Sequence, residues 1–215
     1  MKSIMFIKSI LTNTFKLVLC KYRQKPKPGE VSMVRDHTKL KELILYIAEK
    51  CEGWGNWGAT MLNKILFFSD FIAYAKYGES ITGEDYFKLP KGPAPKYLVA
   101  AREQLERAED AVVQKKPTLR GIQDRLIPLR EPELSYFKAE QIAIVDYVID
   151  ELKNENSDSV SGLSHTFYGW QTAKDKEIIP YNTVFLKEPV LREMPSAVRI
   201  AIAKLAKKHG SRQAI

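Results

Sequence analysis

The residue types best suited to metal binding or nucleophilic catalysis are few in this chain: three histidines and two cysteines. His37, His165 and His209 lie far apart, and none has a partner ligand at the helical spacing of three or four residues that a metal site needs. Cys20 and Cys51 form no CxxC motif, and no base is indicated beside either thiol. We therefore expect no metal site and no cofactor, and we interpret His165 as a packed or capping histidine.

Two further features suggest chemistry on first inspection. The run Gly53–Gly58 matches the dinucleotide motif GxGxxG, but a helical pattern precedes it and two tryptophans crowd it. We interpret it as a connection between helices. Lys64 lies in a row with Phe68 and Phe71 and is expected to extend its stem past these rings to a paired head; a catalytic lysine of low pKa is the alternative. Neither GxSxG nor GxxxxGK[ST] occurs, so we expect no enzyme, although an active site assembled from distant residues stays open.

Mostly helical elements would position these residues. A length of 215 residues with 45% hydrophobic and 28% charged residues is typical of one globular domain with extensions. Apolar periodicity and capping residues predict a compact, mainly α domain with a small antiparallel β-sheet, an α+β fold. The expected helices span 36–50, 59–77 (ended by Gly78), 95–110 (opened by Pro95), 135–152 (capped by Ser135) and 161–175, and the expected strands lie at 86–89, 112–113 and 125–129.

The net charge of +8 belongs to the two ends of the chain. Residues 1–35 carry eight basic and one acidic residue, residues 187–215 carry seven and two, and residues 36–186 carry nineteen and twenty-three. Attraction to nucleic acid or to an anionic membrane would therefore come from the ends, since the acidic middle lacks a basic stripe. We expect a basic extension and linker over 1–35, a central domain over 36–188, and a basic C-terminal helix and tail over 189–215.

Residues 3–20 have helical apolar spacing that Lys8 and Lys16 interrupt. The run is too short and too charged for a membrane span, and it lacks the cleavage site of a signal peptide. We expect a cytoplasmic protein. An amphipathic helix here would either pack on its own domain or contact a membrane surface peripherally.

The central domain resembles a known family through a set of short motifs in order. These are Met61–Phe71 with its Asn-Lys-Ile-Leu-Phe-Phe-Ser-Asp core, Gly78, Ile81-Thr82-Gly83, Tyr86, Lys91-Gly92-Pro93-Ala94-Pro95, Leu163-Ser164-His165, Trp170 and Ile179-Pro180-Tyr181. Together they are similar to the Panacea domain, the SocA-like antitoxins that include phage-associated GepA-like proteins. The resemblance implies an antitoxin that neutralises a toxin, encoded beside it, by direct protein contact. It implies scaffold roles for Lys64, Asp70, Gly83, Gly92, Pro93 and His165, and no catalytic residue.

An antitoxin needs surface anchors for its toxin, and interface hot spots favour aromatic and arginine side chains. The chain has twenty-two aromatic residues, ten of them tyrosines. Our candidate contacts near the sheet and the late helix are Tyr86, Lys88, Lys91, Tyr97, Arg102, Tyr168 and Trp170. Three alternatives stay open: a DNA-binding regulator of its own operon, an adaptor that delivers the toxin to a protease, and, last, an enzyme. Homo-oligomerisation is open as well.

Overall fold

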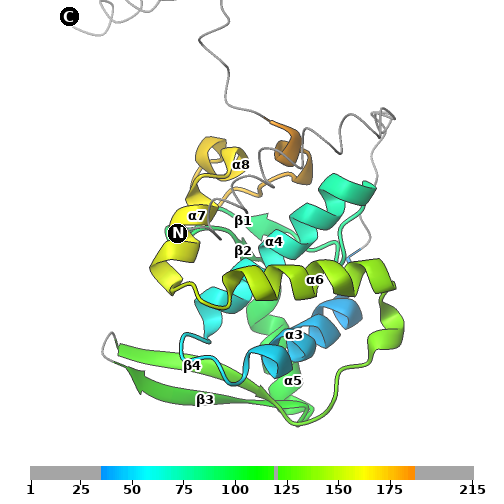
Figure 1. Cartoon of the computed structure of the whole chain (residues 1–215), viewed down its shortest axis with the longest axis vertical. Helices are drawn as coiled ribbons and strands as arrows, with labels where there is room; N and C mark the ends of the chain where they lie inside the picture. The colour runs from blue at the N-terminus through cyan, green and yellow to red at the C-terminus, as the bar shows by residue number, and fades with distance from the viewer. Residues whose placement is uncertain (1–34, 119–120, 187–215) are drawn as a thin grey trace, which may run out of the picture. The chain divides into compact units, whose positions relative to one another are not determined.

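The computed structural model describes residues 35–118 and 121–186 (Figure 1). The expected amphipathic helix over 3–20, the linker and the basic C-terminal helix lie outside these residues. Within them the chain forms six α-helices and two small antiparallel sheets. The predicted α+β class is confirmed.

Two helices form the centre of the domain (Figure 1). Helix α3 spans His37–Cys51, and the Asp36 carboxylate caps it by accepting a hydrogen bond from the Lys39 amide at 3.0 Å. Helix α4 spans Ala59–Tyr77 and is buried on most sides. It ends at Gly78, whose φ of +79° is the left-handed conformation that glycine adopts without a Cβ clash. The predicted connection at Gly53–Gly58 is confirmed, since it joins these two helices and buries Trp54 and Trp57.

The later helices begin at positions other than those expected. Ser135 caps no long helix: it lies in the short 3-10 helix η2 (Leu134–Tyr136), and α6 spans Ala139–Leu152. The expected helix over 161–175 is two helices, α7 (Ser157–His165) and α8 (Tyr168–Thr172). The break falls at Phe167, whose backbone is extended so that its ring enters the aromatic core.

The first sheet lies against α4. Strand β1 (Tyr86–Phe87) pairs antiparallel with β2 (Ala94–Pro95), and on its other side Phe87 bridges to Ile178. Pro95 does not open a helix, because it lies in β2 opposite Tyr86. Helix α5 starts later and spans Leu98–Arg107. A proline fits at an edge strand because no ladder hydrogen bond needs its missing N–H there.

The second sheet is a β-hairpin separate from the first. Strands β3 (Ala111–Thr118) and β4 (Gly121–Pro128) pair over eight positions, much longer than the two short strands that the sequence predicts. The base of the hairpin packs on the helices, and its far end extends beyond them (Figure 1). A further 3-10 helix, η3 (Tyr181–Phe185), packs against α4 and α8.

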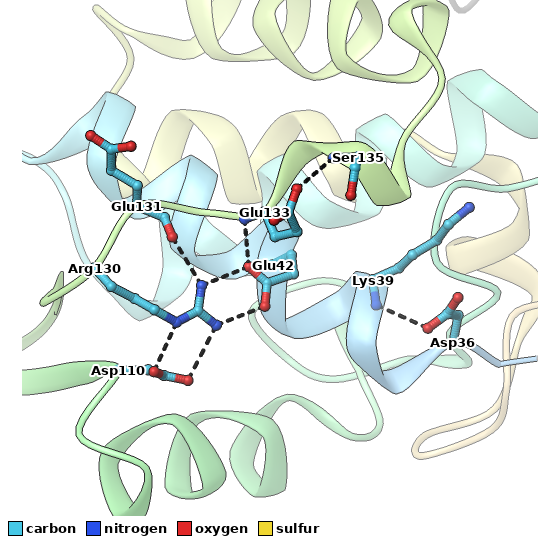
Figure 2. Close-up of polar contacts among 8 residues, drawn as sticks. All are labelled: Asp36, Lys39, Glu42, Asp110, Arg130, Glu131, Glu133 and Ser135. Atoms are coloured by element: carbon cyan, nitrogen blue, oxygen red, sulfur yellow. Dashed lines mark hydrogen bonds and ion pairs between the residues drawn. The ribbon is translucent and has the colours of Figure 1, made fainter.

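Arg130 holds the base of the hairpin to α3 (Figure 2). Its guanidinium donates two hydrogen bonds to Glu42 on α3 (2.9 and 2.7 Å) and two to Asp110 before β3 (2.8 and 3.2 Å). The Glu133 amide donates to the same Glu42 carboxylate at 2.8 Å. Burial by itself would raise the pKa of Glu42, but the hydrogen bonds and charge of Arg130 outweigh it, and the pKa lies below its usual value.

We predict that Arg130→Gln lowers the free energy of unfolding by about 2 kcal/mol at neutral pH, because it leaves a buried carboxylate without its cation. Because the pKa of Glu42 is lowered in the folded state, its contribution to the free energy of unfolding is present above pH 4.5. This contribution is lost as the pH falls through the folded-state pKa. Urea unfolding of both proteins from pH 7 to pH 3 should therefore show the two stabilities converging at low pH.

The matched control is Arg107→Gln, which removes an ion pair to Glu103 whose side chains are 76% and 54% exposed. It should change stability by less than about 0.5 kcal/mol at any pH. Equal effects of the two substitutions at neutral pH would contradict a special role for Arg130.

Candidate functional site

Asp70 is the buried centre of the segment that carries the sequence motifs. It lies on α4 with no exposed surface and accepts hydrogen bonds from the amides of Ile81 (2.8 Å) and Thr82 (2.9 Å). Two hydroxyls also donate to it, those of Thr82 (2.5 Å) and Tyr86 (2.7 Å). Gly83 turns the chain into β1 with a φ of +69°. One carboxylate thus fixes the 80–83 turn and β1 to the middle of α4.

Burial is the main cause that raises the pKa of Asp70, and the four hydrogen bonds act in the opposite direction by stabilising the carboxylate. All four donors are neutral. Asp70 therefore serves as a hydrogen-bond acceptor that organises a turn, with its proton-binding atoms closed off from any substrate.

Tyr86 belongs to the core, which corrects its expected place on the surface. Its side chain is 0% exposed, and its ring packs edge-on against Phe67 and Phe71 with centroids 5.6 Å from each. Tyr181 stacks on Phe71 at 4.5 Å and donates its hydroxyl to the Glu84 carbonyl at 2.7 Å. A side chain so enclosed offers no area to a partner.

Lys64 is also buried, with 1% of its surface exposed, so its stem does not carry the head out to solvent. Its ammonium donates to the Pro93 carbonyl at 3.0 Å, and no carboxylate among the described residues forms an ion pair with it. Burial lowers the pKa of Lys64 to about 8. A low pKa was also expected for a catalytic lysine. The ammonium, however, bonds to a main-chain carbonyl inside the domain.

Gly92 explains how the turn approaches this lysine so closely. Its φ is +96°, and a Cβ at this position would lie 2.2 Å from Ser164 Oγ and 2.8 Å from Lys64 Cε. Only glycine fits here. The Lys91–Pro95 turn, α4 and α7 therefore meet at Gly92.

His165 is packed, as predicted. Its imidazole stacks on Trp170 with ring centroids 4.0 Å apart and planes inclined by 14°. Burial, followed by the charge of Lys64, lowers the pKa of His165, which favours the neutral ring. Trp170 donates its indole N–H to the Leu89 carbonyl at 3.2 Å, and Lys88 Nζ lies 4.5 Å from the Trp170 ring.

The remaining candidate contacts fall into two groups. Lys88 and Trp170 form one group beside α8, next to the exposed turn residue Lys91. Tyr97 lies against His37 with ring centroids 4.0 Å apart and planes inclined by 35°, and it accepts a hydrogen bond from Gln104 at 2.8 Å, which places it at the start of α5 beside α3. Arg102 lies further along α5 and Tyr168 starts α8; both are partly buried. Within the part of the chain that the structure describes, no hydrogen bond or ring contact joins the two groups.

The sequence predicts two short strands in this region, but neither the length of the hairpin nor its attachments to the helices. Trp57 donates its indole N–H to the Leu126 carbonyl at 3.2 Å, and Arg125 is buried where its guanidinium donates to the Trp54 and Gly55 carbonyls. These partners lie about 70 residues apart in the chain, and no local spacing signals them. The two tryptophans in the Gly53–Gly58 segment were the one available signal, since buried indoles need an acceptor.

The described residues offer little further chemistry. No group of three His, Cys, Asp or Glu side chains in residues 35–118 and 121–186 could hold a metal ion. Burial raises the pKa of the Cys51 thiol to about 12, which makes it a poor nucleophile. No helix in these ranges is both long enough and apolar enough to cross a bilayer.

The segment that carries Lys64 and Asp70 matches a known protein family. The model of the family "Antitoxin SocA-like, Panacea domain" matches residues 62–171, just over half of the chain. The chain therefore belongs to the SocA-like Panacea family. The matched range runs from α4 to α8 and includes the Asp70 and Lys64 centres and the β3–β4 hairpin. No curated protein and no solved structure matched the chain.

We predict that Lys64→Met changes the pH dependence of stability. Because the folded pKa of about 8 lies below the ordinary 10.5, the unfolded chain binds the extra proton between these values. The wild-type free energy of unfolding should therefore gain about 3 kcal/mol relative to Lys64→Met as the pH rises from 7.5 to 10.5.

The measurement is urea unfolding of both proteins at several pH values. Taking the difference between their free energies of unfolding cancels the titration of the other lysines and tyrosines. Lys76→Met, at an exposed position of the same helix, is the control and should give a pH profile parallel to wild type. Parallel profiles for Lys64→Met would show that the Lys64 ammonium keeps an ordinary pKa.

Proposed function

We propose that this protein is an antitoxin that holds a cognate protein toxin inactive by binding it directly, without chemistry of its own. The observation that carries the proposal is membership of the SocA-like antitoxin family over residues 62–171. The toxin itself is not specified by this domain.

The arrangement of the motif residues supports a binding role. Asp70 and Lys64 direct their polar atoms to the main chain and to hydroxyls inside the domain, and Tyr86 is enclosed by aromatic rings. These residues determine the shape of the molecule and leave recognition to its surface. Binding at nanomolar affinity needs about −12 kcal/mol, which a standard interface of about 800 Å² per partner supplies.

We further propose that the turn before α5 contributes to the toxin surface through its exposed end. Lys91 is exposed, and Tyr97 at the start of α5 is partly exposed. Lys88, Arg102, Tyr168 and Trp170 remain candidate contacts. Tyr86 is removed from the set because it is buried.

The decisive experiment is co-expression with the product of the adjacent gene. We expect that product to arrest growth when expressed alone and to be tolerated when this chain is co-expressed, with the two proteins co-eluting at a constant ratio on gel filtration. Rescue without a stable complex, or rescue accompanied by disappearance of the toxin, would favour operon regulation or delivery to a protease over direct neutralisation.

A second prediction tests the surface at the turn. The double substitution Lys91→Glu and Tyr97→Ala should weaken toxin binding about tenfold or more while leaving the circular-dichroism melt close to that of wild type. Lys153→Glu, an exposed residue just beyond α6, is the charge control and should bind normally. Full neutralisation by the double variant would refute this placement.

A further inference from the structure

Residues 176–179 lie along the side of β1 that β2 leaves free, and they extend the first sheet. The Lys88 amide donates to the Glu177 carbonyl at 2.9 Å, and the Ile179 amide donates to the Tyr86 carbonyl at 2.8 Å. Strand β1 is therefore paired on both sides, with β2 along its other side. The side chains of this sheet are held in place by main-chain hydrogen bonds.

The register separates an inner from an outer face of this sheet. Successive side chains of a strand point to opposite faces, and residues directly opposite each other share a face. Tyr86 points into the core, so its neighbour Phe87 points outward. Ala94 lies opposite Phe87 on β2, and Ile178 lies opposite it on the other side. The outer face thus carries a row of three apolar side chains, those of Ala94, Phe87 and Ile178.

This apolar row is accessible from outside the domain. The Ile178 side chain is 40% exposed, whereas that of the next residue, Ile179, is buried. Phe87 and Ala94 are partly exposed. A partner that packs on this row meets a preformed surface, so binding requires little further ordering of this chain.

Lys96 places a positive charge on the same face. Its amide donates to the Asp85 carbonyl at 2.8 Å, which continues the β1–β2 register by one pair, and its ammonium lies 5.6 Å from the centroid of the Phe87 ring. Asp85 shares the face but is paired with Arg35. Within residues 35–118 and 121–186 no carboxylate forms an ion pair with Lys96. The Lys96 charge is therefore not neutralised by the part of the domain that the structure describes.

The charge of the segments around this sheet indicates the kind of partner. Residues 86–96 and 168–180 carry five basic and two acidic residues, whereas the rest of the 36–186 region carries fourteen basic and twenty-one acidic residues. One of the two acidic residues, Glu177, accepts a hydrogen bond from the Lys174 amide at 2.6 Å. An apolar row with a positive charge beside it is complementary to an apolar side chain accompanied by a carboxylate.

A protein surface fits this combination better than a nucleic acid does, because the phosphate backbone that would meet Lys96 offers nothing apolar to Ile178. The face also borders both groups of candidate contacts, since Phe87 precedes Lys88 and Lys96 precedes Tyr97 in the chain.

Resting on the proposed antitoxin function, we infer that the outer face of the first sheet binds a surface of the toxin that presents a carboxylate beside an apolar side chain. The carboxylate pairs with Lys96, and the apolar side chain packs on Phe87 and Ile178. The three residues contribute different parts of the affinity, so charge and apolar contact can be tested separately.

Charge reversal on this face tests the ionic part. Against the inactivated product of the adjacent toxin gene in calorimetry, Lys96→Glu should bind at least about tenfold more weakly than wild type, and the loss should shrink as NaCl rises from about 0.05 to about 0.5 M. Lys50→Glu is the matched control. Lys50 is also exposed and lies 5.3 Å from an aromatic ring, that of Tyr46, but at the end of α3 opposite to Asp36, whose amide bonds to the turn before β1. It should bind within about twofold of wild type, because its charge is screened over that distance.

A second pair of variants tests the apolar part. Ile178→Ser should weaken toxin binding about threefold or more, since it removes the exposed end of the apolar row. Its control is Ile122→Ser on the β3–β4 hairpin, where the side chain is 72% exposed. Ile122→Ser should bind as wild type does.

The outcomes separate the two proposals. If wild type neither binds nor neutralises the toxin, the antitoxin function fails. If wild type neutralises it, normal toxin binding by Lys96→Glu or by Ile178→Ser, or an equal loss for Lys50→Glu, overturns the proposed face. Loss of binding to promoter DNA by Lys96→Glu, with toxin binding unchanged, would assign the face to nucleic acid and overturns the inference as well.

Should Lys96→Glu melt early, acetylation of lysines in the wild-type protein decides. Mass spectrometry should show that Lys96 is protected when the toxin is bound, while Lys50 is labelled equally with and without toxin. Equal labelling of Lys96 in the two samples overturns the inference.

Discussion

The carboxylate of Asp70 is the interaction on which the rest of the domain depends. It lies inside a helix that is apolar on most sides, where an unpaired charge would be costly, and two amides and two hydroxyls stabilise it. Those four donors come from the 80–82 turn and from β1. The same bonds that satisfy the carboxylate therefore determine where the first sheet begins, ahead of the turn between its two strands.

Lys64, two turns earlier on α4, fixes the other end of that turn through the Pro93 carbonyl. Lys64 and Asp70 do not pair with each other; each is satisfied by backbone or hydroxyl groups of the segment that α4 must hold. Gly92 makes the arrangement possible, since any side chain there would collide with Ser164 and Lys64. Residues that look chemical in the sequence thus serve packing.

The hairpin depends on a second set of charges. Arg130, which follows β4, donates to Glu42 on α3 and to Asp110 before β3, so it joins both strands to α3 at the base of the hairpin. Arg125 and Trp57 hold β4 to the α3–α4 connection. These contacts fix the base of the hairpin to the helical part of the domain.

The sequence by itself determined α3, α4 and their connection, because periodicity, the Asp36 cap and the Gly78 stop are local signals. Its motif order also indicated the family. Only the tertiary structure decided that Tyr86 is core, that Pro95 lies in a strand, that residues 161–175 break at Phe167, and that β3 and β4 form a long separate hairpin. Each of these depends on contacts between residues far apart in the chain, such as Arg130 with Glu42 or Tyr86 with Asp70. Local propensity carries no information about such partners, because their burial and hydrogen bonding exist only once the chain has folded.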